Sequence, residues 1–218
     1  MNQIFEVLGF LLIVFTLLMQ WEIHVRRIII LFAASSFIIA IFLVLLGLSR
    51  PHEEYLLFVL AGLTIVVRGI TIPVVMNKAL RRLYNKPWRV REDKPLFGVG
   101  GSILLSLVLI AIGYFIYQNS LYSVLKVRSG SVPFALFLQA SLLIISHKHA
   151  YIQMIGFLVM ENAVVMLSGW VFGGLPFIIE AGVILDLLGL VVVSSLIIRV
   201  RESAILREGD TYESELRG

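Results

Sequence analysis

The sequence predicts an all-α, polytopic membrane protein with about seven transmembrane helices, its N-terminus outside and its C-terminus inside. Two observations predict this class. Hydrophobic residues make up 59% of the 218 residues and charged residues only 15%, whereas soluble domains carry roughly 25% charged residues. Apolar runs of about 20 residues, which match the roughly 30 Å hydrocarbon core of a bilayer, recur along the chain.

The N-terminal region, residues 1–96, is expected to hold three spans followed by a basic loop. No basic n-region or small-residue cleavage site accompanies the first apolar segment, so we interpret it as a retained span. The loop at 78–96 reads KALRRLYNKPWRVREDKPL. We interpret it as a solvated loop that sets topology, with a docking surface for a peripheral subunit or anionic lipid as the alternative. The three expected spans lie near residues 3–20, 28–49 and 55–77.

The rest of the chain divides into a fourth span with an outer loop (97–130), a three-helix module (131–198) and a cytoplasmic tail (199–218). Helices are expected throughout because open strands would leave backbone groups unpaired in lipid. The fifth span is short and is flanked by Pro133 and His147. The expected spans of this part lie near residues 97–118, 131–147, 151–172 and 175–198.

The basic residues support this arrangement. With seven spans, the outer side receives only Arg50, Lys126 and Arg128, while fourteen basic residues fall on the other side. Such a bias predicts that the richer side is cytoplasmic. The cytoplasmic set is Arg26, Arg27, Lys78, Arg81, Arg82, Lys86, Arg89, Arg91, Lys94, Lys148, Arg199, Arg201, Arg207 and Arg217.

Four ionisable residues lie inside expected spans: Arg68 in the third, Glu161 in the sixth, and Glu180 and Asp186 in the seventh. Each costs about 2.5–3.5 kcal/mol at the centre of a lipid-facing helix, so they must face protein or water. A buried carboxyl group can stay protonated near neutral pH, and a series bridged by water can relay protons. We therefore predict a proton or cation pathway through Glu180, Glu161 and Asp186. The alternative is a structural ion pair in which Arg68 holds one of them.

His147, Lys148 and His149 form a basic turn between the fifth and sixth spans. We interpret it as a turn at the cytoplasmic interface. Two alternatives are proton transfer to or from Glu161 and a metal site built on the His-x-His pair. Further polar residues in the spans are interpreted as packing contacts or as extensions of a polar line: Gln139, Asn162 and Ser168.

The run from His147 to Leu190 resembles hydrogenase-4 component E, a membrane subunit of group 4 hydrogenases and formate hydrogenlyase-like complexes. The residues that carry the resemblance are the triplet MEN, which ends at Asn162, and the pattern P-x-x-x-E-x-G-x-x-x-D from Pro176 to Asp186. The layout of three spans, a basic loop and a fourth span before this block is also similar.

The last three expected helices also look like the small three-helix subunit of complex I and of multisubunit cation/proton antiporters. In that family, two glutamates in successive helices are held to be part of the proton path. Glu180 matches the second glutamate. The family's first glutamate aligns with Leu158, and Glu161 lies three residues later, on the same helix face.

The resemblance implies a subunit of a large complex in a prokaryotic cytoplasmic membrane, with no catalytic activity of its own. It implies antiporter-like membrane partners and a peripheral, metal-bearing redox arm on the cytoplasmic side, and no nucleic acid. Because the chain has no cysteine, we expect no cofactor in it, and iron–sulfur, nickel–iron or flavin centres on partner subunits. Alternatives are a purely structural anchor subunit and a free-standing transporter or seven-helix receptor.

Overall fold

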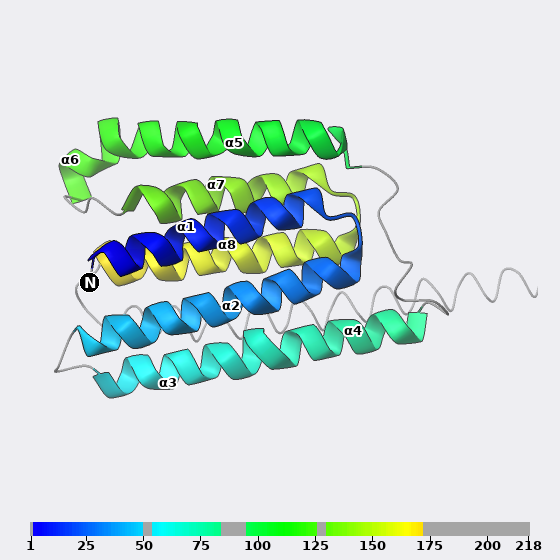
Figure 1. Cartoon of the computed structure of the whole chain (residues 1–218), viewed down its shortest axis with the longest axis horizontal. Helices are drawn as coiled ribbons and strands as arrows, with labels where there is room; N and C mark the ends of the chain where they lie inside the picture. The colour runs from blue at the N-terminus through cyan, green and yellow to red at the C-terminus, as the bar shows by residue number, and fades with distance from the viewer. Residues whose placement is uncertain (1, 50–53, 84–94, 126–129, 172–218) are drawn as a thin grey trace, which may run out of the picture.

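Long helices run alternately in opposite directions and pack side by side in the computed structural model (Figure 1). The structure describes residues 2–49, 54–83, 95–125 and 130–171. Each of these stretches is nearly all helical, and they contain no strand. The helices are α1 (Asn2–Trp21), α2 (Val25–Leu48), α3 (Glu54–Thr64), η1 (Ile65–Thr71), α4 (Ile72–Leu83), α5 (Gly98–Ile116), η3 (Tyr117–Leu121), α6 (Tyr122–Leu125), α7 (Ser131–Ser146) and α8 (Ala150–Val171).

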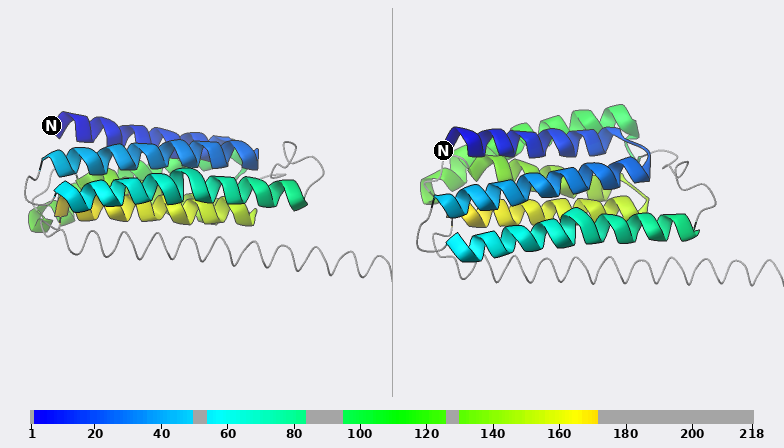
Figure 2. Two further views of the ribbon diagram at one scale, coloured as in Figure 1. Left: turned by 90° about the horizontal axis from the view of Figure 1, so that it is seen from below. Right: turned by 60° about the horizontal axis from the view of Figure 1, so that its bottom comes forward.

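Two helices at the edges of the bundle flank a central group of helices. The continuous helix α3–η1–α4 and the helix α5 lie at opposite edges, with α1, α2, α7 and α8 between them (Figures 1 and 2). Helix α8 packs against α7 and α2, and α7 also contacts α1 and α5. Two-thirds (67%) of the apolar stretch of α8 is buried, against 17% of that of α5. The last described helix is therefore central, and α5 presents most of its apolar surface outward.

Five helices in the described part of the chain are long and apolar enough to cross a membrane. They coincide with the first four expected spans and the sixth. Helix α7, Ser131–Ser146, is apolar but shorter, in agreement with the short fifth span predicted from Pro133 and His147. The expected seventh span, 175–198, lies outside the described residues. The five spanning stretches are Gln3–Trp21, Val25–Leu48, Leu57–Arg81, Gly98–Leu125 and Ala150–Leu167.

Small residues bring the central helices close together. A Cβ atom added to Gly156 would lie 2.8 Å from Ile144 Cγ1 and 3.3 Å from the Ala140 carbonyl oxygen. The backbones of α8 and α7 therefore lie close together at Gly156. A Cβ on Gly113 would lie 2.9 Å from the Cα of Ala135. Close backbone approach at small residues is the usual way membrane helices gain van der Waals contact, because burial against lipid supplies no hydrophobic driving force.

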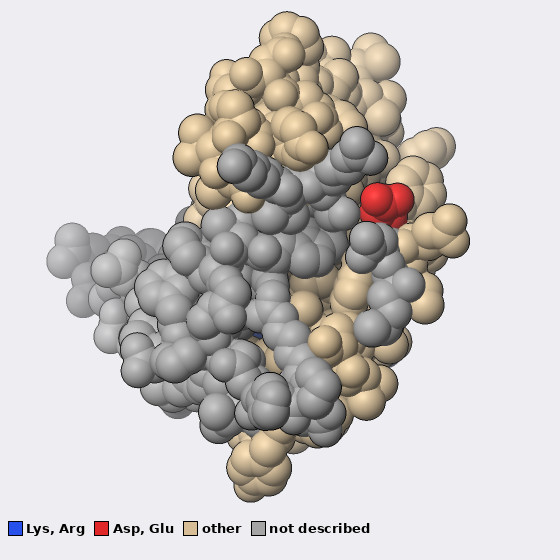
Figure 3. All heavy atoms as spheres, turned by 90° about the vertical axis from the view of Figure 1, so that its left-hand side faces the viewer, with Lys and Arg blue, Asp and Glu red and all other residues tan. Residues whose placement is uncertain are grey.

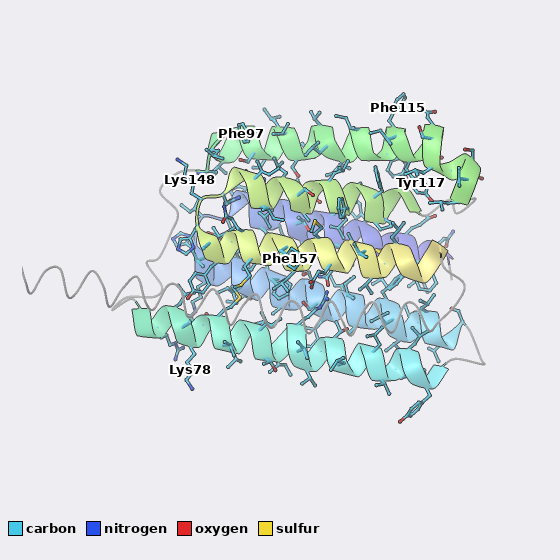
Figure 4. The ribbon with its side chains drawn as sticks, turned by 180° about the vertical axis from the view of Figure 1, so that it is seen from behind. Lys78, Phe97, Phe115, Tyr117, Lys148 and Phe157 are labelled. Carbon is cyan, nitrogen blue, oxygen red and sulfur yellow. The ribbon has the colours of Figure 1, made fainter. Side chains whose placement is uncertain are left out.

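Charged residues are segregated along the bundle. Apart from Arg68, every described lysine and arginine lies at the end where α1 stops and α2 begins, and Figure 4 shows Lys78 and Lys148 at this end, on opposite sides of the bundle. The opposite end carries no lysine or arginine on its described surface (Figure 3). The described basic residues at the first end are Arg26, Arg27, Lys78, Arg81, Arg82 and Lys148.

Candidate functional site

Arg68 projects from a π-helical turn in the middle of the α3–η1–α4 helix. In this wider turn the Ile72 N–H donates to the Val67 carbonyl, and Thr71 Oγ1 donates to the Val66 carbonyl at 2.7 Å. Pro73 follows immediately and cannot donate a backbone hydrogen bond, which disrupts a regular α-helix at this point. Single π-helical turns are frequent at functional sites, and this one carries the only described arginine that lies away from the basic end of the bundle.

Glu161 and Asn162, neighbours on α8, both accept hydrogen bonds from Arg68. The distance from Arg68 Nη2 to Glu161 Oε2 is 3.0 Å, and from Arg68 Nη1 to Asn162 Oδ1 it is 2.6 Å. All three residues are at most 2% exposed. The planar guanidinium thus uses two of its nitrogens on two adjacent acceptors, a geometry that the point charge of a lysine would not reproduce.

The pair lies about halfway along both helices. Arg68 is eleven residues from Leu57 and thirteen from Arg81, the limits of its spanning stretch. Glu161 is eleven residues from the start of α8 and ten from its end. At 1.5 Å per residue, each lies roughly 15–20 Å from the helix ends. This is the depth at which an unpaired charge is most costly in a bilayer.

The structure therefore brings together two of the four ionisable residues predicted inside spans, Arg68 and Glu161. The pairing of Arg68 with one carboxylate is the arrangement that the structural alternative requires. Glu180 and Asp186 lie outside the described residues, so their predicted place in the pathway stays a prediction. Asn162, interpreted from the sequence as a packing contact or part of a polar line, is a direct partner of Arg68.

The predicted basic turn lies at the end of the bundle and does not touch the pair. His147 is buried, with Nδ1 2.9 Å from Ser146 Oγ and 3.2 Å from the Leu143 carbonyl oxygen. Lys148 is exposed at the tip (Figure 4). Glu161 is more than ten residues further along α8, or about 16 Å from its start. Transfer of protons between this turn and Glu161 would need intermediate groups.

Buried glutamines join α1 to α7. Gln20 Nε2 donates to Ser146 Oγ at 3.0 Å, and Gln139 Nε2 donates to the Ile13 carbonyl at 3.2 Å. Gln139 was predicted from the sequence to be a polar residue of the spans, whereas Gln20 and Ser146 were not. The signal that was available is the presence of amide and hydroxyl groups in apolar spans, where such groups hydrogen-bond across helices.

No group of three histidine, cysteine, aspartate or glutamate side chains in the described ranges is arranged to hold a metal ion. His147 and His149 take other partners. His147 is bound as described above, and the His149 ring lies 5.6 Å from that of Tyr151, centroid to centroid. The described site is a buried ion pair with an amide acceptor beside it.

Comparison with known proteins identifies a similar protein but indicates no activity. No family model matches the chain, and no solved structure matches it. The chain is 27% identical over 185 residues to the uncharacterized protein Rv0085 of Mycobacterium tuberculosis. The similarity covers 84% of this chain and 81% of that protein.

Proposed function

We propose that this chain is a membrane subunit of a respiratory, complex I-like assembly of the hydrogenase type, and that it supplies part of a proton or cation path. The observation that carries the proposal is the Arg68–Glu161 ion pair, in which both side chains are 2% exposed. Ionisable residues at this depth are rare and mark ion or proton paths more often than simple packing. The MEN triplet containing Glu161 supports the assignment to hydrogenase-4 component E.

Arg68 binds both Glu161 and Asn162, and this double contact suggests how the ion pair takes part in proton transfer. A proton that reaches Glu161 neutralises the carboxylate and weakens its hold on Arg68, since hydrogen bonds between charged groups are roughly twice as strong as neutral ones. Asn162 does not titrate, so it keeps its 2.6 Å hydrogen bond with Arg68. Glu161 can then take up and release a proton while Asn162 holds the Arg68 guanidinium in place. A residue that relays protons must be able to change its charge in this way.

The remaining parts of the proposal complete the path and its setting. Glu180 and Asp186 continue the path in a seventh span, which brings the tail to the same side as the basic end of the bundle. That end faces the cytoplasm and the redox arm, in line with the excess of basic residues there. Partner subunits hold the metal centres, because this chain has no thiolate ligand to offer.

A structural anchor is the second candidate function, and the same ion pair favours it. The Arg68 side chain joins η1 to α8, so the pair fixes how the edge helix meets the central one. Breaking a buried pair by removing one partner is strongly destabilising, whatever its role in conduction. The experiment must therefore separate assembly from ion movement.

The test is redox-driven proton uptake by inverted membrane vesicles that carry the chain in its native complex. Glu161→Gln keeps an oxygen acceptor for Arg68 but cannot load a proton, so we expect the complex to assemble while ion uptake falls at least tenfold. Assembly is measured by affinity purification through a tag on this chain. Antiporter-like and metal-bearing subunits should copurify with it.

Glu6→Gln is the matched control, because it is the same chemical change at an exposed position of α1. It should leave both assembly and uptake unchanged. Normal uptake in Glu161→Gln vesicles would exclude conduction through this residue and leave the anchor role. Purification of the chain alone as a functional oligomer would exclude the complex-subunit proposal.

A further inference from the structure

A groove opens at the basic end of the bundle, between the end of α1 and the beginning of α2. It has a volume of about 500 Å³ and is mostly apolar inside, with charged groups at its rim. A smaller hollow of about 320 Å³ adjoins it and shares Arg27 and Ile30. The groove is lined by Leu18, Trp21, Glu22, Arg27, Ile30 and Leu31, and His24 and Arg26 line the hollow.

The rim of the groove carries a net positive charge. The Glu22 carboxylate accepts hydrogen bonds from the backbone N–H groups of Ile23 and His24 at 3.1 and 3.0 Å. It also binds the His24 ring at 2.7 Å and Arg27 Nη1 at 3.2 Å. Arg26 is exposed and has no ion pair among the described residues. The groove and the hollow together thus contain two arginines and one acidic side chain, which is held in local contacts.

The position of the groove matches the boundary between the hydrocarbon core and the headgroups. It lies where two spanning helices end, and Trp21, which is 64% exposed, stands at its mouth. Tryptophan is enriched at this level of the bilayer. Ile30, 54% exposed, lies about 8 Å further in along α2. A ligand there would meet cations at the end of the helices and an apolar wall towards their middle.

We propose that this groove binds an acidic phospholipid, with the phosphate against Arg26 and Arg27 and an acyl chain along Leu18, Ile30 and Leu31. Basic pockets between transmembrane helices bind acidic headgroups in this way, and each arginine contributes about five-fold in affinity. The occupant is a lipid and not a soluble anion, because half of the site is an apolar wall inside the membrane. This site is separate from the Arg68–Glu161 pair and does not depend on ion conduction.

The test is native mass spectrometry of the purified full-length protein in its complex, titrated with phosphatidylglycerol. Arg26→Gln leaves the Arg27–Glu22 ion pair intact and should weaken binding roughly five-fold; Arg26→Gln/Arg27→Gln should weaken it about 25-fold. Ile30→Ala should also weaken binding without unfolding the chain, since Ile30 is half exposed. Phosphatidylcholine should bind the unaltered protein no better than the double variant binds phosphatidylglycerol.

Matched controls separate a built site from a general surface charge. Lys78→Gln/Lys148→Gln removes two charges at the same end, and Ile41→Ala truncates an equally exposed isoleucine (49%) on α2. Both should bind phosphatidylglycerol normally. Equal loss in the lysine control would overturn the proposal in favour of diffuse attraction. If glycerol phosphate displaces phosphatidylglycerol at a similar concentration, the groove is a site for soluble anions and the proposal is wrong. If another protein subunit covers the groove in the lipid-free complex, the groove is a protein interface and the proposal is also wrong.

Discussion

At the scale of single residues, the described site is an ion pair buried among apolar helices. Arg68 is 1% and Glu161 2% exposed, and their neighbours on η1 and α8 are mainly apolar. A buried pair of this kind gains Coulomb energy but loses the hydration of both charges, and the net effect on stability is often near zero. Its presence is therefore better explained by function or by specificity of helix pairing than by stability.

A double-mutant cycle should reveal this balance. Arg68→Met leaves the Glu161 charge buried without its guanidinium, so we expect a loss of about 3–5 kcal/mol in unfolding free energy. The same loss is expected for Glu161→Leu. The combination Arg68→Met/Glu161→Leu removes both charges and should cost far less than either single change, as measured by unfolding in detergent. Additive losses would mean that the two side chains do not interact.

Glu22, which lines the groove at the basic end of the bundle, should make the stability of the protein depend on pH. Burial acts to raise the pKa of Glu22, but hydrogen bonds from His24 and Arg27 outweigh it and hold the pKa below its ordinary 4.5. A carboxylate with a lowered folded-state pKa stabilises the fold above its unfolded pKa, and loses that effect as pH falls through the folded value. The unaltered protein should thus have a higher Tm than Glu22→Gln near pH 7. The difference should shrink as the pH falls below 4.5 and through the lowered folded-state pKa of Glu22, and a difference that does not change with pH would contradict this origin.

The residues of the site could be predicted from the sequence, but their pairing could not. Charge inside an apolar run identifies Arg68 and Glu161, because the cost of burial is the same for any fold. Which carboxylate meets Arg68 depends on the rotation of α8 and on the π-helical turn around Arg68. Neither has a signal in hydropathy. The role of Asn162 was open for the same reason, since an amide in a span suits a packing contact and an arginine partner equally well.

At the scale of helices, length and composition predict the elements well. The expected first, second, fifth and sixth spans agree with the described helices to within three residues because an apolar run must match the bilayer, whereas the helices of the third and fourth run further. The expected third span ended at 77, whereas the helix continues to Leu83. The basic residues Lys78, Arg81 and Arg82 form its polar last turns. Cations at a helix C-terminus interact favourably with its dipole, which explains why the helix extends beyond its apolar part.

The contact between α7 and α8 offers a sharp test of packing. In Gly156→Ala the new Cβ lies 2.8 Å from Ile144 Cγ1 and 3.1 Å from the Ile144 backbone nitrogen. The two helices must separate, so we expect a loss of about 1–3 kcal/mol. Gly62→Ala, in α3, meets nothing within 4 Å and should stabilise the helix by up to about 1 kcal/mol. Unfolding of both variants in detergent should give shifts of opposite sign; an equal loss in both would contradict a steric cause specific to Gly156.

At the scale of the whole molecule, the distribution of charge relates the bundle to the membrane. Six described basic residues gather at one end, and they come from three separate parts of the chain: α2, α4 and the turn between α7 and α8. Hydropathy alone could predict the spans, but only the alternation of the helices brings these residues to one face. Six of the fourteen residues predicted on the cytoplasmic side thus lie together at one end, and the three predicted on the outer side, Arg50, Lys126 and Arg128, lie outside the described residues. The side of the membrane that this end faces is the remaining prediction.

Single cysteines provide the measurement, because the natural chain has none that would react. Lys78→Cys and Lys148→Cys place a thiol at the basic end, and Asn119→Cys places one at the exposed opposite end in η3. The positive-inside rule predicts that an impermeant maleimide labels Asn119→Cys in intact cells and the two lysine positions only after permeabilisation. The reverse pattern would invert the proposed orientation.

The same reagent decides the number of spans. Helix α8 runs away from the basic end (Figure 1), so a chain that stopped crossing after α8 would leave its tail on the same side as Asn119. A seventh span over 175–198 returns the tail to the basic end. Ser214→Cys should therefore be protected in intact cells and labelled with Lys148→Cys after permeabilisation. Labelling of Ser214→Cys together with Asn119→Cys would remove the seventh span, and with it the intramembrane setting on which the proposed roles of Glu180 and Asp186 depend.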